Sequence, residues 1–289
     1  MDDTNILPKE LRVSTMTATS KFSCSISLET IFDKLVLDEH ILCIEFGDKI
    51  KGINKKKVSQ KKKMKKKVFF NQITIIILYK NINHNIKLFN NGSISMTGVK
   101  SKEIGKKVIH LLFDKLVSIK SNTVFLEDNP SIVDFNIVLI NSDYTINYEL
   151  KRDVLHQLLV NDYNIYSSYE SCIYPGVNSK YFWNEDYKEL PFKGKCYCKG
   201  FCDGKGTGKG ESNCKKITIS AFQSGSIIIT GANSIEQIKV TFDFINSIFK
   251  KHESILKKDI PKFINNELLQ KTNKMKNVMY IKKSNIVYN

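Results

Sequence analysis

The sequence has no apolar run long enough to cross a membrane. Its longest candidate, Ile73–Leu78, is far below the roughly 18 residues that a spanning helix needs. The N-terminus, Met1-Asp2-Asp3-Thr4, lacks the basic and apolar segments of a secretory signal. The seven cysteines are odd in number and unevenly spaced, which disfavours a secreted disulfide framework. We therefore expect an intracellular protein that has no membrane partner.

Arginine is nearly absent. Only Arg12 and Arg152 occur, so the net charge of +16 comes almost entirely from lysine. Such an excess favours a polyanionic partner, nucleic acid before an anionic membrane surface. An AT-rich genome would also produce this abundance of lysine, isoleucine and asparagine, and part of the charge is then ordinary solvated surface. With 42% apolar and 10% aromatic residues, the chain has enough material for a core.

The most informative feature is an internal duplication. Residues 85–103 read NIKLFNNGSISMTGVKSKE, and residues 218–236, at a constant offset of 133, read TISAFQSGSIIITGANSIE. Nine of these nineteen positions are identical: Ile86/Ile219, Phe89/Phe222, Gly92/Gly225, Ser93/Ser226, Ile94/Ile227, Thr97/Thr230, Gly98/Gly231, Ser101/Ser234 and Glu103/Glu236. Agreement of this extent over so short a window indicates two copies of one structural unit.

Each copy reads as strand, tight turn, strand and helix. The turns at 90–92 and 223–225 end in glycine, which tolerates positive φ. The second strands are predicted over Ser93–Thr97 and Ser226–Thr230, each followed by a glycine.

A helix is predicted after each hairpin, because Ser101 and Ser234 are natural N-caps with a glutamate in the first turn. Apolar residues then recur on one side, which suits packing on a sheet. They are Ile104, Val108, Leu111, Leu112 and Leu116 in copy one, and Ile235, Ile238, Phe242, Ile245 and Phe249 in copy two. A shorter helix is expected to open each copy, over Leu28–Leu37 and Lys151–Val160.

The duplication divides the chain into copy one, residues 1–125, and copy two, residues 130–258, joined at Asp128-Asn129-Pro130. Residues 259–289 form a polar, lysine-rich tail with little periodicity. Copy one is interrupted by Lys55–Lys67, which has nine lysines in thirteen residues. The interruption is predicted to be a self-repelling loop that attracts phosphates without reading sequence; an ordinary solvated loop is the alternative.

The duplicated block resembles the repeat of TATA-binding proteins, which carries the pattern I/L-F-x-S-G-K-x-x-x-T-G-A. AFQSGSIIITGA (221–232) matches it closely, with Ser226 in place of the lysine, and LFNNGSISMTGV (88–99) matches less closely. YSSYESCIYPGV (166–177) resembles the family's FSSYEPELFPGL, and FSCSISLETI (22–31) resembles its LGCKLDLKTI. The lysine-rich character and the long insertions resemble the versions that large DNA viruses encode.

This resemblance implies an α+β fold: a two-repeat saddle whose curved antiparallel sheet carries helices on its convex face. Each copy would follow the order β-α-β-β-β-β-α. The concave face would lie in the minor groove of double-stranded DNA, where aromatic and apolar wedges unstack base steps, as in complexes of TATA-binding proteins. Such binding distinguishes mainly A·T from G·C pairs.

Carried over position by position, the resemblance implies wedge residues in both copies. In copy two they are Phe222 and, with a change, Tyr174. In copy one they are Phe89 and Phe46, with Glu45 in the competing register. The complete predicted DNA-binding set is Phe46, Phe89, Thr97, Tyr174, Pro175, Phe222, Ser224, Ile228 and Thr230. Judged by spacing alone, the phenylalanines could instead pack in the core.

Other groove-facing positions depart from the family. Ungapped alignment of the opening strands puts Thr15 and Val138 where the family has a symmetric pair of base-contacting asparagines, which argues against strict TATA selectivity. Copy one is also more polar there, with Lys87, Asn91 and Ser95.

Four cysteines form the one group with metal-binding character: Cys196, Cys198, Cys202 and Cys214, in the Gly- and Cys-rich segment 194–216. Their C-x-C-x3-C-x11-C spacing departs from the C-x2-C pairs of common zinc ribbons, yet four such thiols could form a tetrahedral zinc site. Reduced cysteines without a metal are the alternative. The segment falls where the family has a loop, or stirrup, at one end of the saddle, which zinc would stiffen for partner binding.

No catalytic motif is present. The five histidines are scattered, and GKGTGKG (204–210) lacks the G-x4-G-K-[ST] pattern of a phosphate-binding loop. We expect a transcription-initiation factor that is not an enzyme, bends A·T-rich promoter DNA and recruits a TFIIB-type factor and RNA polymerase. The alternative is a protein-interaction adaptor without tight DNA binding. Either would act in the nucleus or a viral replication compartment, or be packaged in a virion.

Overall fold

The structure, a computed structural model, describes residues 8–52, 70–119, 124–187 and 193–258. Copy one contributes β1 (Arg12–Phe22), α1 (Leu28–Lys34), β2 (Ile41–Phe46), β3 (Lys49–Gly52), β4 (Gln72–Tyr79), β5 (Ile82–Phe89), β6 (Ser93–Val99) and α2 (Lys102–Ser118). Copy two contributes β7 (Ile132–Thr145), α3 (Arg152–Asn161), β8 (Tyr166–Ser168), β9 (Gly176–Trp183), the 3-10 turn η3 (Glu185–Tyr187), β10 (Lys215–Phe222), β11 (Ser226–Ala232), α4 (Ile235–Lys251) and α5 (Glu253–Leu256). The predicted lysine run, Lys55–Lys67, and the tail, 259–289, lie outside the described residues.

All of these strands form one antiparallel sheet of 11 strands, in the order β3-β2-β4-β5-β6-β1-β7-β11-β10-β9-β8. Apart from β3 in copy one and η3 and α5 in copy two, both halves contain the same elements in the same order. The predicted α+β fold is therefore confirmed. Across the described ranges, no helix is long and apolar enough to cross a membrane.

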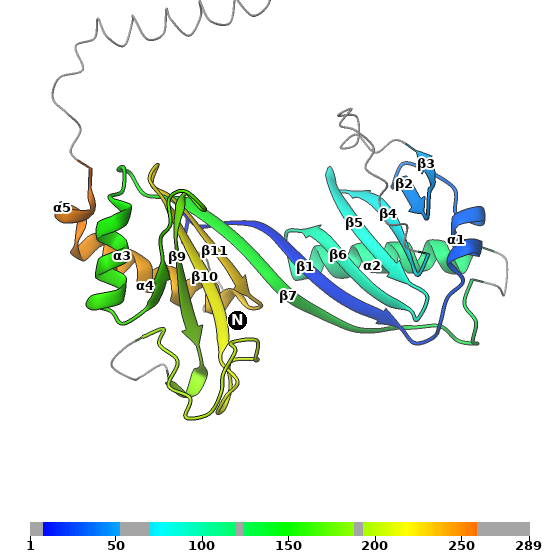
Figure 1. Ribbon diagram of the computed structural model, residues 1–289. Helices are drawn as coiled ribbons and strands as arrows, with labels where there is room; N and C mark the ends of the chain where they lie inside the picture. The colour runs from blue at the N-terminus through cyan, green and yellow to red at the C-terminus, as the bar shows by residue number, and fades with distance from the viewer. Residues whose placement is uncertain (1–7, 53–69, 120–123, 188–192, 259–289) are drawn as a thin grey trace, which may run out of the picture.

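The long strands β1 and β7 lie side by side in the middle of the sheet and join its two halves (Figure 1). They pair antiparallel, and Met16 lies opposite Ile140. The other strands follow outward in corresponding order on each side. The sheet thus has a pseudo-twofold axis between Met16 and Ile140. Helices α2 and α4 each cover one half, and α1 and α3 lie near the two ends (Figure 1).

The hairpins of the two copies keep the register that the duplication predicts. Thr97 pairs with β5 at the place where Thr230 pairs with β10, so the offset of 133 holds in three dimensions. Gly92 and Gly225 close the turns with φ of 80° and 81°. A side chain at either position would place its Cβ within 2.4 or 2.6 Å of a backbone oxygen, so both turns require glycine.

The predicted N-caps are also present: Ser101 Oγ accepts a hydrogen bond from the Ile104 N–H, and Ser234 Oγ from the Gln237 N–H. The apolar stripes of α2 and α4 pack into one continuous core with the covered face of the sheet. Helix α1 is shorter than predicted and ends at Lys34, because the backbone is already extended at the next residue.

Candidate nucleic-acid interface

The sheet face opposite the helices, which we name the concave face, is formed by alternate residues of each strand. In β10, Ile217, Ile219 and Ala221 are buried toward the helices, whereas Thr218 and Phe222 occupy alternate positions on the other face and are half-buried. The same alternation places Thr97 of β6 and both Ile228 and Thr230 of β11 on the concave face. Ser224 is exposed in the turn beside it. These predicted site residues thus share one surface.

Copy two carries a pair of aromatic rings. The centroids of Tyr174 and Phe222 lie 5.8 Å apart in an edge-to-face arrangement, which favours the contact. Gly176 lies directly beneath them, and an added Cβ there would be 3.0 Å from the Tyr174 ring and 3.1 Å from the Phe222 ring. A larger residue would displace the rings. Tyr174 is 39% exposed, so the pair is open to solvent.

One of the two arginines supports this pair. Arg152 donates hydrogen bonds to the carbonyl oxygen of Pro175 and, at 3.0 Å, to Oε1 of Gln223. Its guanidinium also lies 5.2 Å from the centroid of the Tyr169 ring. Arg152 therefore connects the loop before β9 to the turn after β10 and fixes the predicted wedge in place.

The structure corrects the second wedge position of copy one. Phe222 pairs with Gly176, two residues after Tyr174; Phe89 pairs with Gln72, two residues after Phe70. Phe70, which is 69% exposed, is therefore the counterpart of Tyr174.

The sequence assignment to Phe46 is wrong in register. Glu45 of β2 pairs with Thr74 as Ser168 of β8 pairs with Asn178, so the next residue, Phe46, corresponds to Tyr169. Phe46 is half-buried, with ring centroids 6.1 Å from Phe32 and 6.4 Å from Phe70. Its edge-to-face contact supports the Phe70 ring.

The centre of the concave face also differs from the ungapped alignment. Thr17 pairs with Thr97 as Asn141 pairs with Thr230, so Thr17 and Asn141 are symmetry mates. Thr15 lies opposite Asn141, and Thr17 lies opposite Leu139.

The mate of Thr15 is therefore Leu139, not the predicted Val138. The pairing of β1 with β7 shifts by one residue next to Thr17, and Val138 is the extra residue of this bulge. Asn141 Oδ1 accepts a hydrogen bond from Thr230 Oγ1. One central asparagine is thus present, in copy two.

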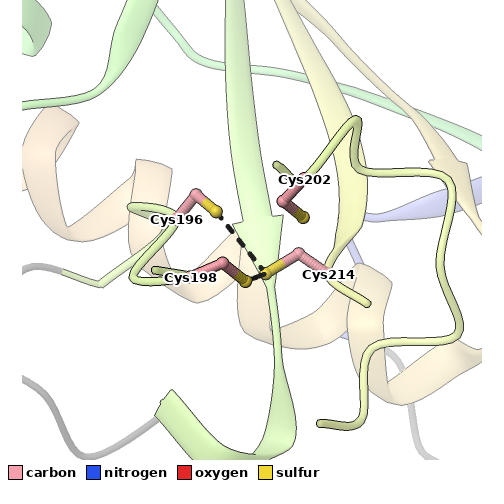
Figure 2. Close-up of side chains that lie close together, drawn as sticks. All are labelled: Cys196, Cys198, Cys202 and Cys214. Carbon is pink, nitrogen blue, oxygen red and sulfur yellow. Dashed lines mark hydrogen bonds between the residues drawn. The ribbon is translucent and has the colours of Figure 1, made fainter. Parts of the chain in front are cut away.

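The four cysteines predicted as a metal site converge in the connection between β9 and β10. Their Sγ atoms all lie within 4.8 Å of one another, and Figure 2 shows the side chains pointing toward a common centre. Cys214 Sγ is 3.4 Å from Cys198 Sγ and 3.8 Å from Cys196 Sγ. The cluster is near enough to hold a metal ion.

This cluster is remote from the aromatic pair. The connection leaves the sheet where Trp183 pairs with Lys215, whereas Phe222 pairs with Gly176 at the other end of the same strands. The segment was expected in a stirrup at one end of the saddle; it lies beside the outer strands of copy two, away from Tyr174. Burial raises the pKa of the Cys214 thiol.

No protein-family model matches the chain. A curated protein named TATA-box-binding protein-like, from Acanthamoeba polyphaga mimivirus, is 28% identical over 272 residues, which make up 86% of this chain and 67% of that protein. The resemblance to TATA-binding proteins is confirmed. Among solved structures, the chain is similar to Methanococcus jannaschii TBP, with a TM-score of 0.49 and 18% sequence identity over 84% of this chain and 99% of that one.

Sequence comparison with TATA-binding proteins placed Lys87 among the groove-facing positions but did not reveal Lys180 and Lys216. Lys87 of β5, Lys180 of β9 and Lys216 of β10 alternate with buried residues and lie on the concave face. Burial lowers the pKa of Lys180, and the neighbouring positive charge of Lys216 lowers it further. Lys180 Nζ donates a hydrogen bond to Thr218 Oγ1 at 3.0 Å.

A carboxylate lies on the same face near its centre. Asp143 is bound by Arg12, with Nη2 to Oδ2 at 2.8 Å, and by the Ser14 hydroxyl. Burial alone would raise the pKa of Asp143, but the hydrogen bonds from Ser14 and Arg12 lower it overall. Asp143 is thus charged at neutral pH, and Arg12 neutralises it.

Proposed function

We propose that this chain is a DNA-binding protein without enzymatic activity, which places the concave face in the minor groove of A·T-rich duplexes and bends them. The observation that carries the proposal is the position of Phe89 and Phe222. They are related by the pseudo-twofold axis, and Phe70 and Tyr174 lie in equivalent places beside them. Wedges at both ends of one open sheet are what kinking two separate base steps requires.

The surface between the wedges suits the floor of a minor groove. Thr97, Thr230 and Ile228 present small or apolar groups, and these can approach sugars and base edges closely. Asn141 provides an amide that can donate to the acceptors that A·T pairs expose there. Lys87 and Lys180 supply positive charge for phosphates, which makes binding depend on salt.

The likeness to the mimivirus protein, whose name describes it as TATA-box-binding protein-like, supports a role in transcription initiation. In this role the concave face binds promoter DNA. The convex side, with α2 and α4, is then free to recruit a TFIIB-type factor and RNA polymerase, in a nucleus or a viral replication compartment.

The second candidate is a protein-interaction adaptor that does not bind DNA tightly, and the polar concave positions of copy one favour it. Lys87 and Ser95 stand where copy two has Ser220 and Ile228. An adaptor would be expected to bury its wedge aromatics. Instead Phe89 and Phe222 are only half-buried, and Tyr174 is exposed, which supports the DNA-binding proposal.

A bending assay tests the proposal. Fluorescence energy transfer between the ends of A·T-rich and G·C-rich duplexes is measured with the full-length protein at two salt concentrations. We expect bending of the A·T-rich duplex, and Phe222→Ala should weaken binding by roughly 1–3 kcal/mol, the scale of one lost aromatic–base stack.

Val117→Ala is the matched control, because Val117 is 53% exposed on α2, away from the concave face. A folded Phe222→Ala protein that binds and bends like the wild type would rule out the wedge. Equal, weak and unbent binding of both duplexes would favour the adaptor.

A further inference from the structure

We propose that Cys196, Cys198, Cys202 and Cys214 bind one zinc ion as four thiolates, and that this ion holds together the connection between β9 and β10. The site is separate from the proposed DNA interface. In a tetrahedral site with zinc–sulfur bonds of about 2.3 Å, the sulfur atoms lie about 3.8 Å apart. The Sγ separations of 3.4 and 3.8 Å at Cys214, and the limit of 4.8 Å for the whole group, surround that value.

Backbone and amide donors surround these sulfur atoms. Ser212 N–H donates to Cys198 Sγ at 3.2 Å, and Asn184 Nδ2 donates to Cys214 Sγ at 3.5 Å. The backbone N–H of Gly204 donates to Cys202, and that of Cys198 to Cys196. Hydrogen bonds of this kind stabilise sulfur that carries negative charge, as metal-bound thiolate does.

The composition of the connection provides a second, independent argument. Residues 193–214 read KGKCYCKGFCDGKGTGKGESNC, in which Tyr197 and Phe201 are the only large apolar residues. Phe201 is 89% exposed. The segment therefore has almost no apolar core, and short segments of this kind usually need a metal or disulfides to fold. All the chain's cysteines are unbridged, which leaves a metal.

A single zinc ion fits better than the alternatives. Four thiolates in a tetrahedron select zinc or iron, and sulfur atoms this close together suit one ion rather than a cluster of several irons. Binding would form four metal–sulfur bonds and release the thiol protons to solvent. Without a metal, four thiolates in this arrangement would repel one another.

The connection covers Trp183, the only tryptophan of the chain, which is 7% exposed. An added Cβ at Gly208 would lie 2.1 Å from the Trp183 ring, so the backbone of the connection lies directly on the indole. The Lys216 N–H donates to the Gly204 carbonyl oxygen at 2.7 Å. Trp183 fluorescence therefore reports whether the connection is in place.

Metal analysis on full-length protein, expressed with zinc and purified without chelator, tests the proposal. We expect close to one zinc ion per chain, far less in Cys198→Ser and Cys214→Ser, and no change in Cys172→Ser, which removes an exposed cysteine outside the cluster. A chelator should shift the Trp183 emission to longer wavelength while far-ultraviolet circular dichroism stays constant. Gly208→Ala should expose Trp183 yet retain zinc.

Three outcomes would overturn the proposal: zinc near zero with the four thiols alkylated as fast as Cys172, a disulfide between Cys198 and Cys214, or iron in place of zinc. If the serine variants fail to fold, alkylation of wild-type protein before and after chelation decides. Protection that the chelator removes supports the site, and equal reactivity rules it out.

Discussion

Replacing Phe70 and Phe46 separately by alanine should distinguish a residue that contributes to DNA binding from one that contributes to folding stability. If Phe70 is the second wedge of copy one, Phe70→Ala should weaken binding to an A·T-rich duplex by roughly 1–3 kcal/mol, or about 5- to 150-fold. Phe46→Ala should change affinity less than about threefold, because Phe46 corresponds to Tyr169 and only supports Phe70.

The structure predicts the opposite ranking for stability. Phe70 is 69% exposed, so less than a third of its area is buried. A fully buried aromatic side chain covers about 150–250 Å², and at about 25 cal/mol/Å² the loss at Phe70 is about 1–2 kcal/mol. Phe46 is half-buried against Phe32 and the core. Its truncation should cost about 2–3 kcal/mol, below the 3–5 kcal/mol of a fully buried phenylalanine.

Fluorescence anisotropy gives the affinities, and denaturant unfolding gives the stabilities, both on full-length protein. Val117→Ala serves as the surface control. The strand register would be refuted if Phe46→Ala weakened binding as much as Phe222→Ala while Phe70→Ala bound normally.

Three further predictions concern charge and pH. Deleting Lys55–Lys67 should weaken binding to all duplexes alike and flatten the salt dependence, because phosphate contacts carry no sequence information; a loss confined to A·T-rich sites in binding titrations would contradict this. Asp143→Asn should raise DNA affinity up to about fivefold by removing a half-buried negative charge worth about 1 kcal/mol or less, whereas Arg12→Gln should lower it; equal effects of one sign would count against the concave interface. Burial lowers the pKa of His84, so its contribution to stability should be complete above about pH 6.5 and be lost as the pH falls, because the unfolded state then binds the extra proton. Denaturant unfolding across this range should show a flatter profile for His84→Leu, but not for His110→Gln, which changes an exposed histidine.

The sequence was sufficient for the features that depend on neighbouring residues. The glycine turns, the serine caps and the one-sided helices are local, and the offset of 133 holds wherever the chain between matched positions has equal length in both copies. It therefore holds from β5 and β10 to the following helices.

The sequence was insufficient wherever an insertion separates the matched strands. The offset is 124 between Thr17 and Asn141, 104 between Gln72 and Gly176, and 133 between Phe89 and Phe222. No ungapped comparison can follow such changes. For the missed wedge a signal did exist: Phe70 stands just before the apolar run Ile73–Leu78, as Tyr174 stands just before β9.

The cysteine cluster shows the same limit. Spacing alone left both a zinc site and free thiols open, because an eleven-residue span between Cys202 and Cys214 can return beside its origin or extend away. In the structure, hydrogen bonds bring this span back beside its origin: Gly206 N–H donates to the Cys214 carbonyl oxygen at 3.0 Å, and Gly208 N–H donates to the Asn213 carbonyl oxygen at 2.7 Å.

The pseudo-twofold axis between Met16 and Ile140 relates two halves that are no longer equal. A duplex has a twofold axis of its own, so an identical pair of halves would bind it equally well in either direction. Here Lys87 of one half replaces Ser220 of the other, and Ser95 replaces Ile228. Each 1.4 kcal/mol of difference between the halves makes one direction tenfold more populated. In the DNA-binding role proposed above, polarity on a promoter is therefore a property of this single chain, acquired when its two copies diverged.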